Sequence, residues 1–100
     1  MADRAIGVIN TGCSENHAQD EQVIRDLAAA RSYRFAGILT IGENTYMPTT
    51  LIVHTAASKG ATVIVAPSLE HFGIAVQAVA LACMLATPTI TVPCTAGRGH

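Results

Sequence analysis

Short apolar runs alternate with longer segments of mixed polarity along the chain. Four runs are rich in Val, Ile, Leu and Thr, which predicts β-strands over 5–9, 35–41, 62–66 and 89–92. Apolar residues at helical spacing predict helices over 17–31, from Pro48 to a stop signal at Gly60, and over 74–86. The last helix is apolar at nearly every position, so we expect it to be buried on more than one side.

Strands that alternate with helices indicate an α/β protein. We expect a single three-layer domain over 5–92, with a mostly parallel four-stranded sheet and the element order βαβαβαβ. A flexible C-terminal tail is expected over 93–100. Ligand sites in such folds lie beyond the carboxyl ends of the strands, which here fall at 10–14, 42–44 and 67–71.

Composition narrows the function. Half of the 100 residues are apolar, 13% are charged and the formal net charge is -1, which disfavours autonomous DNA binding. The basic residues are scattered without a visible basic stripe: Arg4, Arg25, Arg31, Arg34, Lys59 and Arg98. Three cysteines without C-x-x-C spacing argue against a disulfide framework or a zinc site, so we expect no metal and no cofactor. The N-terminus lacks a signal-peptide pattern and no apolar stretch reaches the roughly 20 residues of a membrane span, which predicts a cytoplasmic protein.

The most distinctive pattern follows the third predicted strand, where Ala66 to Gly73 reads Ala-Pro-Ser-Leu-Glu-His-Phe-Gly. The segments Gln22 to Leu27 and Lys59 to Val65 precede it. In this order the segments resemble the catalytic domain of serine recombinases, the resolvases and invertases. In that family the last motif reads Leu-Asp-Arg-Leu-x-Arg or, in degenerate actinobacterial relatives, Val-Pro-Ser-Leu-x-His-Leu-Gly. The resemblance spans 5–92 and implies a resolvase-like fold.

The resemblance also implies a site in which a serine attacks a phosphodiester while arginines hold the phosphate. The family's first motif, Tyr-x-Arg-x-Ser, falls on the first predicted strand. Aligned without gaps, it places Val8 at the Tyr position, Asn10 at the Arg position and Gly12 at the nucleophile. Ser14 is reached only by a shift of two residues, which then places Gly12 at the Arg position.

The second motif also departs from the family. Glu70 stands at the Asp position, His71 at the first Arg position and Ile74 at the last Arg position. A single electrostatic donor in such a site is typically worth roughly a hundredfold in rate, so these losses predict a catalytically inactive domain.

Two groups of residues remain candidates for chemistry. Cys13 and Ser14 lie on the loop after the first strand, where a nucleophile could be held by loop amides as in small phosphocarrier domains; the alternative is an ordinary loop with an incidental thiol. Glu70 and His71 could form an acid–base pair, or His71 could meet His17 across the strand ends. Ordinary polar contacts of loop residues are the favoured alternative.

Three further residues are candidates for ligand binding because of their place at the strand ends: Asn10, Gly12 and Ser68. For Ser68, a structural role as the cap of a following helix is the alternative.

The leading hypothesis is an inactive serine-recombinase-like domain that serves as a protein-interaction or regulatory module. We expect a homodimer formed through the apolar helix from Ile74 to Ala86. One alternative is a small enzyme or phosphocarrier that uses the Cys13–Ser14 loop. A weaker one is an accessory recombination protein with residual DNA binding.

Overall fold

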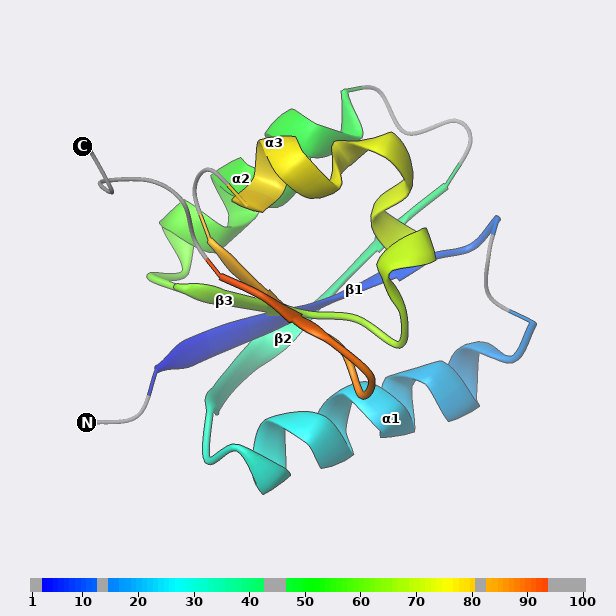
Figure 1. Ribbon diagram of the computed structural model, residues 1–100, viewed down its shortest axis with the longest axis vertical. Coiled ribbons are helices and arrows are strands. Elements are labelled where there is room, and N and C mark those ends of the chain that lie inside the picture. The colour runs from blue at the N-terminus through cyan, green and yellow to red at the C-terminus, as the bar shows by residue number, and fades with distance from the viewer. Residues whose placement is uncertain (1–2, 13–14, 43–46, 81–82, 94–100) are drawn as a thin grey trace.

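The computed structural model describes residues 3–12, 15–42, 47–80 and 83–93 (Figure 1). In chain order its elements are β1 (Arg4–Asn10), α1 (His17–Ala30), β2 (Arg34–Ile41), α2 (Pro48–Ser58), β3 (Val63–Val65), the 3₁₀ helix η1 (Leu69–Ala75), α3 (Val76–Ala80), β4 (Met84–Ala86) and β5 (Thr91–Val92). The predicted α/β class is therefore confirmed.

The strands form one five-stranded sheet in the order β2-β1-β3-β4-β5. The first four strands run parallel, and β5 pairs antiparallel with β4. Helix α1 covers one face of this sheet, and α2, η1 and α3 cover the other (Figure 1). The three layers agree with the prediction, whereas a sheet of only four strands was wrong.

Helix α1 is fixed at both its start and its buried face. The Asn16 side chain accepts a hydrogen bond from the Gln19 backbone N–H at 3.1 Å, which caps the first turn. Ile24 and Ala28 turn inward onto the sheet. A Cβ added to Gly7 of β1 would lie only 2.7 Å from Ile24 Cγ2, so the absence of a side chain there allows α1 to lie close to β1.

Strand β2 contains one irregularity that keeps its apolar residues on the correct faces. The register with β1 changes between Ala5 and Gly7, which pair with Phe35 and Ile38, so β2 has one extra residue. Gly37 lies in this bulge at φ 143°, where an L side chain is strained. As a result, Phe35 and Ile38 both pack on the α1 side.

The predicted long helix over 74–86 was wrong. The helical segment begins earlier, with η1 at Leu69, and α3 ends at Ala80. Met84–Ala86 is instead strand β4, which pairs with β3 in the interior of the sheet. A short strand covered on both faces is apolar at every position, and periodicity cannot distinguish it from a buried helix.

The predicted strand over 89–92 is shorter than expected, and it runs antiparallel rather than parallel to its neighbour. Residues 87–90 form the loop of a β4–β5 hairpin, so only Thr91 and Val92 are in β5. The buried Thr87 closes this loop: its hydroxyl donates to the Ile90 carbonyl at 2.8 Å and accepts from the Ile90 N–H at 3.0 Å. The expected tail lies outside the described residues except for the exposed Pro93. In the described part of the chain, no helix has the length and apolar character needed to cross a membrane.

Candidate functional site

The topology brings two loops together at the carboxyl end of the sheet. Strand β1 lies between β2, which follows it in the chain, and β3, which pairs with its other edge. In parallel sheets, loops diverge at such a switch point and leave room for a ligand. The two segments here are Asn10–Gly12, after β1, and Pro67–His71, after β3. We call this region the carboxyl-end site.

Asn10 and His71 hold these two segments together. The Asn10 backbone N–H donates to His71 Nδ1 at 2.9 Å, and the Asn10 side-chain amide donates to the His71 carbonyl at 3.4 Å. The Asn10 side-chain oxygen in turn accepts from the Gly12 N–H at 2.9 Å. Three of the predicted site residues therefore meet in one hydrogen-bonded group, although they come from distant parts of the sequence.

This group fixes the protonation state of His71. The imidazole is buried, with only 4% of the residue exposed. Burial lowers the pKa of His71 below its usual value of 6.5, although the nearby carboxylates of Asp20 and Glu70 oppose this effect. Because Nδ1 accepts a hydrogen bond, the proton of the neutral ring lies on Nε2. His71 therefore offers a donor at Nε2 rather than a base.

A cavity of about 540 Å³ opens beside His71, between the β3 loop and the start of α1. It is lined by Glu15, Asn16, Gln19, Asp20, Val23, Pro67, Ser68 and His71. The full charges among these residues are the carboxylates of Glu15 and Asp20, because His71 is held neutral. Such a lining accommodates neutral or cationic polar groups and repels a phosphate.

The other predicted residues have different outcomes. Cys13 and Ser14 lie outside the described residues. Glu70 is exposed and does not line the cavity, although its carboxylate raises the pKa of His71 against the effect of burial. His17 lies beside Glu21 on α1, with 3.8 Å between His17 Nε2 and a Glu21 carboxylate oxygen, and does not line the cavity either. Ser68 lines the cavity but makes no capping hydrogen bond, so its expected capping role was wrong.

Sequence reasoning missed the contribution of α1 to this cavity. Asn16, Gln19 and Asp20 lie at or near its first turn. The signal was available in part, because an Asn three residues before a polar residue is typical of a helix start, and helix starts in α/β folds follow the strand ends. Within the described segments, no group of three His, Cys, Asp or Glu residues could hold a metal ion.

Comparisons with protein-family models, curated proteins and solved structures gave no match to this chain. The likeness to serine recombinases therefore depends on the residues of the two motifs. The residues that the alignment places at three of the family's catalytic positions, Asn10, Gly12 and His71, meet in the carboxyl-end site, and the family relationship itself stays a prediction.

Proposed function

We propose that this chain is a non-catalytic relative of serine-recombinase catalytic domains that serves as a protein-interaction or regulatory module. The observation that carries this proposal is the bond between Asn10 and His71. These residues stand where the resemblance places two arginines. An amide and a neutral imidazole stand there instead, joined by the Asn10 N–H, so neither presents a positive charge to a substrate.

The electrostatics of the cavity support the same conclusion. Phosphoryl transfer needs cations or oriented donors at the developing negative charge. Here the lining combines a neutral imidazole with the carboxylates of Glu15 and Asp20. A phosphodiester would meet repulsion from both carboxylates, and the described lining residues offer it neutral donors but no cation, which favours a role other than strand cleavage.

Incubation with supercoiled plasmid tests the loss of catalysis. We expect neither nicked plasmid nor a covalent protein–DNA adduct after denaturation. Strand breaks joined to the protein, and abolished by Ser14→Ala, would overturn the proposal. The variant Cys13→Ser is the matched control, because it changes the neighbouring side chain without removing Ser14.

We further propose that the interaction partner is a second copy of the chain, and that it binds on the outer face of α2. The helix α2 contains no charged residue, unlike α1. Met47 and Leu51 are 53% and 36% exposed, and shallow hollows of about 240 and 440 Å³ lie along this face. A two-fold interface places each patch against its own copy, so an uncharged face avoids pairing like charges.

This surface replaces the expected interface over Ile74 to Ala86, because part of that segment is the interior strand β4. Sedimentation equilibrium over a concentration series tests the proposal. We expect a dimer that Leu51→Glu converts to a monomer, while Ala29→Glu on the exposed face of α1 leaves the dimer intact. A monomeric wild-type chain at all concentrations, or a dimer unaffected by Leu51→Glu, would overturn it.

A further inference from the structure

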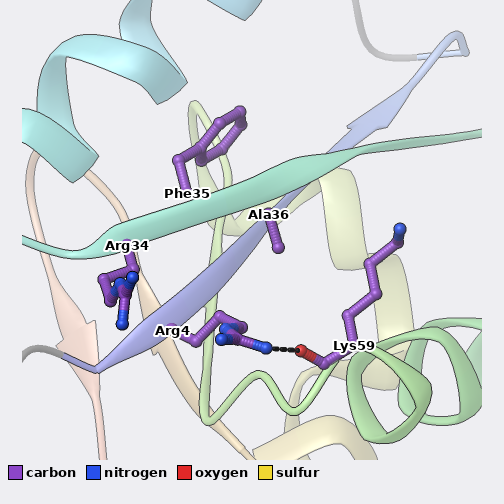
Figure 2. A pocket seen from close by; sticks show the side chains of 5 residues that line it. All are labelled: Arg4, Arg34, Phe35, Ala36 and Lys59. Atoms are coloured by element: carbon purple, nitrogen blue, oxygen red, sulfur yellow. Dashed lines mark hydrogen bonds between the residues drawn. The ribbon is translucent and has the colours of Figure 1, made fainter.

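Three basic residues line one cavity at the amino end of the sheet, opposite the carboxyl-end site; the Lys59 ammonium group points away from the two guanidinium groups (Figure 2). Arg4, Arg34 and Lys59 line a cavity of about 390 Å³ together with Phe35 and Ala36 (Figure 2). All three basic residues are exposed. Three of the six arginine and lysine residues of the chain therefore lie together in the fold, although up to 55 positions separate them in the sequence. We call this region the amino-end site.

The sheet register and the end of α2 produce this arrangement. Arg4 and Arg34 are paired residues at the first positions of neighbouring parallel strands. Parallel partners point to the same face of a sheet, so both side chains lie on the face that α2 covers. Lys59 is the C-cap residue, which directly follows Ser58 at the end of α2. The Arg4 guanidinium Nη1 donates to the Lys59 carbonyl at 3.0 Å, as Figure 2 shows, and this bond ties β1 to the end of α2.

The charges of the amino-end site are not neutralised by neighbouring acids. In the described part of the chain the ion pairs are those of Glu21 with His17 and with Arg25, which involve none of the three cations. Asp3 contacts this region through its backbone, since its carbonyl accepts from the Arg34 N–H at 2.8 Å. None of the described residues that line the cavity carries a carboxylate. A net-acidic chain thus maintains a local positive potential at one place.

The hydrogen bond of Arg4 explains only a part of this arrangement. It satisfies a carbonyl in the last turn of α2, which is a structural role. It uses one of the five N–H donors of the guanidinium, and neither Arg34 nor the Lys59 ammonium group takes part in it. Most of the donors at this site are therefore available to a ligand.

We propose that the amino-end site binds a compact anion with several negative charges, of the diphosphate type. Arginine forks match phosphate oxygens in pairs, and a lysine adds a point charge. The small cavity and the acidic remainder of the chain favour a compact ligand over an extended nucleic-acid backbone. This inference is independent of the proposed interaction role, which concerns the outer face of α2.

Isothermal titration calorimetry of the full chain with inorganic pyrophosphate tests the proposal. We expect saturable binding that Arg34→Gln and Lys59→Gln each weaken roughly tenfold, as expected for loss of a charge-assisted contact. Arg31→Gln is the matched control, because it removes the same charge from the end of α1, where the guanidinium donates to Thr91 outside the cavity, and is expected to leave the affinity unchanged. Thermal unfolding of each variant verifies that it folds.

Three results would overturn the proposal. The first is the absence of saturable binding. The second is equal weakening by Arg31→Gln, which would indicate attraction by overall charge. The third is tighter binding of a duplex oligonucleotide through the same residues, which would make the region a nucleic-acid contact instead. None of these results bears on dimer formation, so a failure here is distinguishable from a failure of the proposed function.

Discussion

The two ends of the sheet have opposite electrostatic character. At the carboxyl end, where α/β folds usually bind ligands, the lining has two carboxylates and a neutral histidine. At the amino end, three cations surround a smaller cavity without an acid in its lining. The difference teaches that charge, more than position at a strand end, decides which end of this sheet attracts an anion.

The largest effect is expected from placing a cation at the carboxyl-end site. In His71→Arg, a permanent charge would occupy a residue position that is 4% exposed, and the Asn10 N–H would lose its acceptor. We expect the free energy of unfolding to fall by about 1 to 3 kcal/mol, because the Asn10 N–H is left without its acceptor, while the carboxylates of Asp20 and Glu70 offset part of the cost of burying the new charge. Urea denaturation measures this change, and the exposed His17→Arg is the control. Unchanged stability in His71→Arg would show that the hydrogen bond between the Asn10 N–H and His71 does not stabilise the fold.

A smaller effect is expected from pH. Burial lowers the pKa of His71 in the folded chain, so the unfolded chain binds this proton at a higher pH than the folded one. Stability should therefore fall as the pH decreases from 6.5 toward the lowered pKa, by at most about 1.4 kcal/mol per pH unit. His71→Asn keeps an acceptor for the Asn10 N–H and should remove this part of the slope. An identical slope in wild type and variant, measured by urea denaturation from pH 5 to 8, would contradict the assigned neutral state.

The amino end offers a paired test of backbone geometry. Both α1 and α2 end with a left-handed residue, Ser32 at φ 59° and Gly60 at φ 68°. The following N–H groups return to the last turns in the same way, from Tyr33 to Ala28 and from Ala61 to Ala56. We expect Gly60→Ala to lower the free energy of unfolding by about 1 kcal/mol and Ser32→Gly to raise it by a similar amount.

Thermal and urea unfolding of these two variants give the signs directly. Gly60→Ala should also weaken pyrophosphate binding, because this turn positions Lys59 and its carbonyl. Ser32→Gly serves as the control for that effect, since it alters a turn outside the cavity. Two changes of the same sign in stability would contradict the assigned helix ends.

The parts of the fold that the sequence predicted are those with a periodic signal. The first three strands and the first two helices follow from apolar runs, apolar residues at helical spacing, and Pro48 at a helix start. The boundary between α3 and β4 did not follow, because Met84–Ala86 is apolar on both faces. The antiparallel hairpin between β4 and β5 did not follow either. The Thr87 side chain closes its loop, and the loop contains no glycine that would have indicated a turn.

The two candidate sites differ in the same respect. Asn10, Gly12, Ser68 and His71 were predictable because strand ends and motifs mark them. The meeting of Arg4 with Arg34 depended on the register of β1 against β2, and Lys59 joined them only because α2 ends there. A sequence pattern specifies strands more readily than it specifies which strand residues become neighbours.

The most direct test is to map pyrophosphate onto the chain by ¹H–¹⁵N chemical-shift perturbation. The account predicts that the largest shifts occur at the amino end, at Arg4, Arg34 and the turn from Lys59 to Ala61. Gly12, Ser68 and His71 should remain unchanged. The largest shifts at those three residues instead would show that the carboxyl-end site still binds phosphate, and would contradict both the anion site and the loss of recombinase chemistry.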